Sequence, residues 1–159
     1  SSDTPAILDI FRERPDINAV IHTHQPYATA VSLIPGLTEL RVCITALANA
    51  AGGNVPITPY SAAGSIDMGI DTVKYVGNGH AVILSQHGVM TVGKDLNQAL
   101  YAAVYLEEAA KWYLAARAAC VNGEIKQMSD AQIQQMVDVF QYYGQGTAKI
   151  PEDLVKRID

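Results

Sequence analysis

The segment INAVIHTH at residues 17–24 is short, rich in β-branched side chains and enclosed by Pro15 and Pro26. A run of this length and composition between two prolines predicts a buried strand rather than a helix. Its polar residues His22 and His24 stand at its end. Because alternate residues of a strand face the same side, both imidazoles are expected to point to one side of a sheet.

A second apolar region lies further along the chain. The run AVILS at 81–85 predicts a strand, and VMTV at 89–92 continues beyond His87 and Gly88. The interruption at the glycine is compatible with a hairpin or with one bent strand.

Helical segments alternate with the strands. Capping residues, prolines in first turns and glycines after last turns mark their ends. Helices are predicted up to about residue 14 and at 25–34, 65–76, 95–121 and 129–140. Short strands are predicted at 40–44 and 55–57, and a glycine-containing loop close to other backbone at 48–54. This order indicates one domain over residues 1–159 with an α/β or α+β layer arrangement.

Composition and charge exclude several classes of protein. With 49% hydrophobic and 17% charged residues, the chain of 159 residues can fold around its own core, which excludes disorder. No apolar run of about 18 residues is present, so no membrane span is predicted. A formal net charge of -5 without a basic block argues against nucleic acid as a partner. Two cysteines, Cys43 and Cys120, are too few for a disulfide framework, and a cytoplasmic location is expected.

The histidines are the residues that point to chemistry. His87 ends a predicted strand, and with His22 and His24 it would complete the three-histidine face of a catalytic zinc-type site. A fourth coordination position would remain open for a substrate. Ordinary half-buried histidines are the alternative interpretation.

Two other groups are expected to be structural. His80 follows the glycine-rich segment 77–79 and is predicted to be a surface residue. Glu107 and Glu108, ahead of Lys111 on the long helix, predict a solvated face, and a supporting role beside the metal site is the alternative.

Five separated blocks, in this order, resemble the class II aldolase/adducin family, and most closely its L-fuculose-phosphate aldolase-like enzymes. The blocks are SSDTP (1–5), IHTHQPYATA (21–30), AGGNVPITPY (51–60), SQHGVMTVGKDLNQAL (85–100) and FQYYG (140–144). The resemblance implies a three-layer α/β/α fold in which helices cover a central, mostly antiparallel sheet. Family members usually carry a substantial segment ahead of the first block, so the chain is expected to lack its natural N-terminal segment.

The same resemblance implies a metal centre. It makes His22, His24 and His87 ligands of Zn²⁺ or another divalent transition metal, and it places Asp3 at the family's catalytic carboxylate. Such a Lewis acid would let an enediolate form at neutral pH without a Schiff-base lysine. Read from composition alone, Asp3 is a helix cap.

Three further residues match functional positions of the family. Ser1 and Ser2 match the serines that hold the substrate phosphate, and helix capping is their alternative role. Tyr143 matches the tyrosine that exchanges a proton with the distal substrate oxygen, and packing is its alternative role. Near the C-terminus, this tyrosine would reach the site of a neighbouring subunit in a homotetramer.

The implied function is a metal-dependent aldolase. It would cleave a phosphorylated ketose, such as L-fuculose 1-phosphate, to dihydroxyacetone phosphate and an aldehyde. An L-ribulose-5-phosphate 4-epimerase-like activity is the alternative. Asn49 stands where epimerase-like members have an aspartate, which favours the aldolase, whereas residues 41–47 contain no counterpart of an aldolase tyrosine. A non-catalytic adducin-like protein would lack the three histidines, which are present here.

Overall fold

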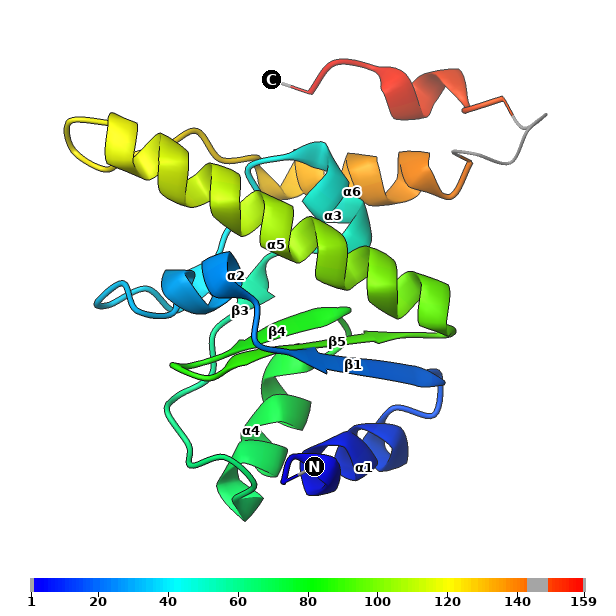
Figure 1. Ribbon diagram of the computed structural model, residues 1–159. Helices are drawn as coiled ribbons and strands as arrows, with labels where there is room; N and C mark the ends of the chain where they lie inside the picture. The colour runs from blue at the N-terminus through cyan, green and yellow to red at the C-terminus, as the bar shows by residue number, and fades with distance from the viewer. Residues whose placement is uncertain (1, 143–148, 159) are drawn as a thin grey trace.

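The computed structural model describes residues 2–142 and 149–158. Within them, a three-stranded antiparallel sheet forms the centre (Figure 1). The middle strand is β5 (Gly88–Gly93), and β1 (Ala19–Thr23) and β4 (Ala81–Leu84) pair with it on either side. Every residue of β4 and β5 is buried, whereas those of β1 are half-buried.

The strands β4 and β5 form a hairpin, so the first of the two alternatives for 81–92 is confirmed. Leu84 lies opposite Gly88, and the turn between them carries His87. Gln86 in this turn has a φ of 57°, in the left-handed region that a side chain rarely adopts. The histidine is therefore presented by a tight, fixed turn.

Helices cover both faces of the sheet, which confirms the three-layer α/β/α architecture (Figure 1). On one face lie α1 (Thr4–Glu13) and α4 (Ile66–Val76), and on the other α2 (Pro26–Val31) and α5 (Leu96–Ala119). Beyond α5, α3 (Thr45–Ala51) packs against α5, and α6 (Asp130–Phe140) packs against α3. A short 3-10 helix, η1 (Glu152–Val155), contacts α6. None of the helices in the described part of the chain has both the length and the hydropathy needed to cross a bilayer.

Alternating strand residues build two apolar cores. The core between the sheet and the helices α1 and α4 contains Ile10, Met68, Val82, Met90 and Val92. The core on the α5 side contains Ile83, Val89, Leu106, Ala110 and Tyr113. Burying each large apolar side chain stabilises the fold by about 1.5–3 kcal/mol. Val20 of β1 packs against the first core, so the side of β1 that carries residue 22 faces α1.

Three predicted helix starts are confirmed by hydrogen bonds. The side chains of Ser65, Asp95 and Ser129 each accept a bond from a backbone amide in the first turn of α4, α5 and α6. Ser129 also forms a capping box with Gln132. Each such cap contributes about 0.5–2 kcal/mol.

The segment at 48–54 corrects one prediction. Its first half is not a loop, because Ala48 to Ala51 complete α3, and alanine is the strongest helix former. Gly52, with a φ of 77°, then ends the helix in the left-handed conformation typical of a C-terminal glycine.

The strand predicted at 40–44 is also shorter than expected. A two-stranded sheet pairs β2 (Glu39–Leu40) with β3 (Val55–Pro56). Beyond β2, the amide of Val42 donates to the side chain of Asn54, and its carbonyl accepts from the amide of Met128. These contacts replace the ladder that a longer strand would need.

Candidate metal centre

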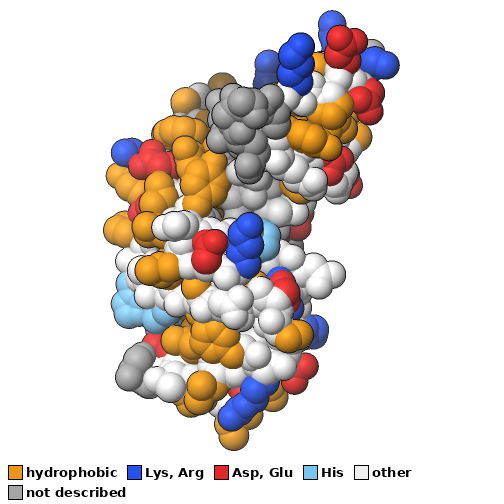
Figure 2. Space-filling model, turned by 90° about the vertical axis from the view of Figure 1, so that its right-hand side faces the viewer, with side chains coloured by type: hydrophobic (Ala, Val, Ile, Leu, Met, Phe, Trp, Pro, Cys, Tyr) orange, Lys and Arg blue, Asp and Glu red, His pale blue; other side chains and the backbone are white. Residues whose placement is uncertain are grey.

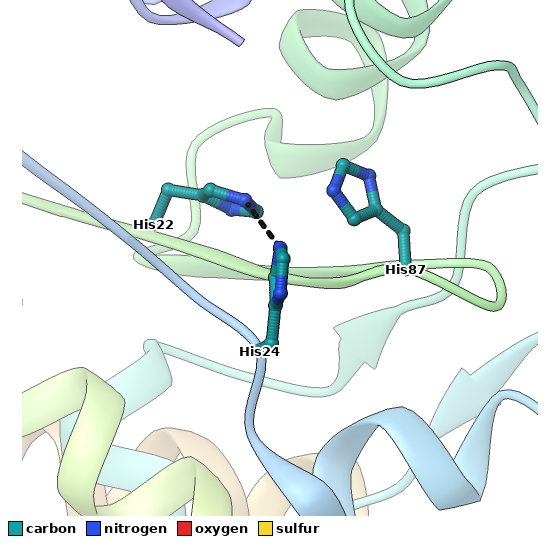
Figure 3. A group of neighbouring side chains, drawn as sticks. All are labelled: His22, His24 and His87. Carbon is teal, nitrogen blue, oxygen red and sulfur yellow. Dashed lines mark hydrogen bonds between the residues drawn. The ribbon is translucent and has the colours of Figure 1, made fainter. Parts of the chain in front are cut away.

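Three histidine side chains converge at the end of β1. His22 is in β1, His24 directly follows the last residue of β1, and His87 is in the β4–β5 turn. One nitrogen from each ring lies within 4.8 Å of the others, and every pair of ring centroids is 5.0 Å apart. Figure 3 shows the three rings pointing toward one another from these separate segments. The expectation that they come together is confirmed.

The His22 ring is oriented by the backbone. Its Nδ1 lies 2.9 Å from the carbonyl oxygen of Val89, and a carbonyl can only accept, so Nδ1 carries the proton. This leaves a lone pair on Nε2, which lies 3.2 Å from Nε2 of His24 (Figure 3). A backbone carbonyl that fixes the tautomer in this way is typical of histidines that bind metals through the other nitrogen.

Gly88 makes the close approach of the segments possible. A Cβ at this position would lie 2.6 Å from the carbonyl oxygen of Thr23 and 3.0 Å from Cδ2 of His24. Real Cβ atoms do not come so close to backbone, so only glycine fits without displacing β1.

Asp3, the residue directly before α1, lies beside the three histidines. It is 5% exposed, and its Oδ2 lies 3.3 Å from Nε2 of His22. Although Asp3 occupies the N-cap position of α1, its side chain makes no capping hydrogen bond to that helix. The carboxylate therefore points toward the histidines rather than serving as a cap.

The environment favours neutral histidine at position 87. Burial lowers the pKa of His87, and the charges of His22 and His24 lower it further, while the Asp3 carboxylate opposes the shift. A neutral imidazole is the form that binds a metal. His24 is exposed, so a ligand can reach the cluster from solvent. Histidine side chains contribute to the molecular surface seen in Figure 2.

The remaining predicted site residues are only partly described. Ser1 and Tyr143 lie outside the described residues. Ser2 is exposed in the turn before α1, and a Cβ on Gly64 would lie 2.9 Å from its carbonyl oxygen. The backbone of Ser2 is thus packed against the loop that leads to α4.

His80 is not the surface residue that the sequence predicted. Its ring is half-buried, and a Cβ on Gly52 would lie 3.4 Å from its Cδ2. Its backbone bonds to Ala51 and to Val92, which fixes it between α3 and β5 and away from the other three histidines. Burial lowers the pKa of His80, and Arg14 lowers it further.

The solvated face predicted at Glu107 is wrong. Instead of lying on a solvated face, its carboxylate accepts bonds from the amides of Tyr27 and Ala28, at 3.0 and 2.9 Å. The available signal was the absence of a capping side chain at the segment Gln25-Pro26, which leaves the first turn of α2 without a local acceptor.

The chain is similar in sequence to a known protein family and to individual enzymes. A family model described as the class II aldolase and adducin N-terminal domain matches residues 1–114. The L-fuculose phosphate aldolase of Escherichia coli strain K12 is 32% identical over 145 residues, which cover 91% of this chain and 65% of that enzyme. A 3-oxo-tetronate 4-phosphate decarboxylase of Pectobacterium atrosepticum is 34% identical over 106 residues, which cover 65% of this chain and 49% of that enzyme.

A solved structure of an L-fuculose 1-phosphate aldolase superposes with a TM-score of 0.82 at 27% identity. The match covers 89% of this chain and 64% of that chain. The present chain thus spans about two thirds of the length of these aldolases.

Proposed function

The chain belongs to the class II aldolase and adducin family, and on that premise we propose that residues 1–159 form one domain of a metal-dependent sugar-phosphate aldolase. Its reaction would be the reversible cleavage of a phosphorylated ketose, such as L-fuculose 1-phosphate, to dihydroxyacetone phosphate and an aldehyde. The observation that carries the proposal is the convergence of three imidazoles beside a buried carboxylate.

The donor set fits a zinc-type ion. Three imidazoles that each bring one nitrogen within 4.8 Å of the others match the ligand set of catalytic zinc, which keeps a fourth coordination position for a substrate. We assign His22, His24 and His87 as the ligands of Zn²⁺ or another divalent transition metal. When bound, such an ion supplies a Lewis acid that polarises a substrate carbonyl.

The remaining site residues are assigned to proton transfer and to binding of the substrate phosphate. Asp3 lies beside the cluster and would take a proton from, and return it to, the reacting carbon of the three-carbon product. Tyr143 would exchange the proton at the aldehyde oxygen, and Ser1 and Ser2 would bind the phosphate. These last three assignments rest on the matching sequence blocks.

The assembly is proposed to be a homotetramer in the cytoplasm. On α5, Leu100, Val104 and Trp112 are between 47% and 51% exposed, and apolar side chains of this kind suit a subunit contact. Light scattering of the full-length protein at micromolar concentration tests this, and a monomer would refute it.

The reaction is tested by following its products. We expect dihydroxyacetone phosphate to be released from L-fuculose 1-phosphate, as detected by a coupled reductase, and the activity to disappear after chelation. Interconversion of pentulose 5-phosphates without release of a three-carbon product would instead support the epimerase. Absence of both reactions in the zinc-loaded protein would refute the proposal.

A further inference from the structure

The first turn of α2 is capped from a distant helix. Gln25 at its N-cap makes no side-chain capping bond, and Pro26 has no amide hydrogen to satisfy. The next two amides, of Tyr27 and Ala28, donate to the two carboxylate oxygens of Glu107 in α5. A charged acceptor on two amides makes this a strong attachment.

The residue after His24 is attached to the same part of α5. The side-chain amide of Gln25 donates to the carbonyl oxygen of Ala103 at 2.8 Å, one helical turn before Glu107. Ala28 itself is fully buried. The backbone that follows His24 is therefore held on α5 by three hydrogen bonds.

The other end of α2 holds the turn that carries His87. The hydroxyl of Ser32 donates to the carbonyl of Thr29 at 2.7 Å, and accepts from the amide of Gln86 at 3.0 Å. Gln86 is the residue with the left-handed backbone, directly before His87. Because Val31 is fully buried, this end of the helix is also packed in the core.

We propose that α2 is a spacer that sets the distance between His24 and His87, with Glu107 and Ser32 as positioning residues. Glu107 fixes the end of α2 nearest His24, and Ser32 fixes the end nearest His87. A helix of six residues with both ends held transmits a displacement at one end to the other. The effect on metal binding rests on the proposed function, whereas the mechanical coupling does not.

The coupling is tested by amide hydrogen exchange on the metal-free protein. In Glu107→Ala, we expect exchange at the distant Gln86 amide to rise at least roughly tenfold, as loss of bonds to a charged group would allow. If the cap has only local effects, amide exchange will rise at Tyr27 and Ala28 and stay unchanged at Gln86. Glu108→Ala is the matched control, since Glu108 makes no hydrogen bond within the described part of the chain.

Metal binding supplies the second measurement. We expect Glu107→Ala and Ser32→Ala each to weaken Zn²⁺ binding roughly 10–100-fold, the usual cost of losing a partner that orients a ligand. The loss of Zn²⁺ affinity in the double variant should be smaller than the product of the two single-variant losses, because both residues act through one helix. The absorption spectrum of the Co²⁺-loaded variants should also change, since it reports ligand geometry.

The outcomes separate this inference from the proposed function. Unchanged exchange at Gln86 together with wild-type zinc affinity in Glu107→Ala would overturn the inference and leave the metal site standing. If the wild-type protein binds no metal, the proposed function fails, and the exchange at Gln86 still decides the coupling. Glu107→Gln, which keeps the shape of the side chain, provides the same comparison if Glu107→Ala does not fold.

Discussion

Oδ2 of Asp3 lies 3.3 Å from Nε2 of His22, and only 7% and 13% of the two side-chain surfaces are exposed. Asp3 stands directly before α1, whereas His22 is in the edge strand β1, so this contact joins two layers of the fold. Both groups are largely shielded from solvent, and the backbone places them side by side because α1 and β1 pack against the same apolar core. The carboxylate is consequently held beside the three imidazoles, within reach of a ligand bound there.

Removing one ligand should remove the metal. We expect His22→Ala to weaken Zn²⁺ binding by more than the roughly 10–100-fold typical of losing an outer partner, because a direct ligand is lost. Equilibrium dialysis followed by metal analysis measures this. His80→Gln, outside the cluster, is the control, and full zinc occupancy in His22→Ala would contradict the site.

Gly88→Ala tests the close approach of β1 and β5. The added Cβ would meet the backbone of Thr23, so the unfolding free energy should fall by about 1–3 kcal/mol, as for an overpacked site. Zinc affinity should fall as well, because His24 must move. Urea denaturation and zinc titration measure the two effects.

A second glycine provides the control. In Gly69→Ala on α4, the new Cβ meets only the flexible end of Asp9 at under 3 Å. A helical alanine should then gain about 0.5–1 kcal/mol over glycine. Equal changes in stability and zinc affinity in the two variants would show that steric contact near His24 does not explain the effect of Gly88→Ala.

Local signals in the sequence predicted much of the fold and of the histidine cluster. The alternation of His22 and His24 on a strand requires only the geometry of extended backbone, and the caps at Ser65, Asp95 and Ser129 act within one turn. Such features depend on neighbours in sequence. They are therefore visible before the structure is known.

The features that escaped prediction depend on distant contacts. The strand after Leu40 ends early because Asn54 and Met128 occupy the hydrogen bonds of Val42. The role of Glu107 depends on amides about 80 positions away, and no local pattern indicates that pairing. In both cases a tertiary contact overrides what the local sequence favours.

The pH dependence of stability should report on His80. Burial and Arg14 lower its folded pKa, so it remains neutral in the folded state while the unfolded chain takes up a proton below about pH 6.5. Its contribution is complete above that pH and is lost as the pH falls toward the lowered folded pKa. The slope is at most about 1.4 kcal/mol per pH unit.

Urea denaturation between pH 7.5 and 5.5, with a chelator present, compares wild type with His80→Gln. We expect the variant to lose less stability over this range. His87 titrates in both proteins and therefore cancels. Identical pH dependence in the two proteins would mean that the burial of His80 does not disfavour its charge.

The Asp3 carboxylate is expected to act as the base in the chemical step. Asn keeps the size of the side chain but cannot accept a proton as a base, so Asp3→Asn should lower kcat by about 100-fold or more. Zinc content should be unchanged, because the three imidazoles remain. Asp9→Asn in the adjoining helix α1, where the carboxylate pairs with Arg12 at the surface, is the matched control. A fall in kcat with unchanged KM would place the loss in the reaction rather than in substrate binding. Full turnover in Asp3→Asn would instead leave the contact with His22 as a purely structural one.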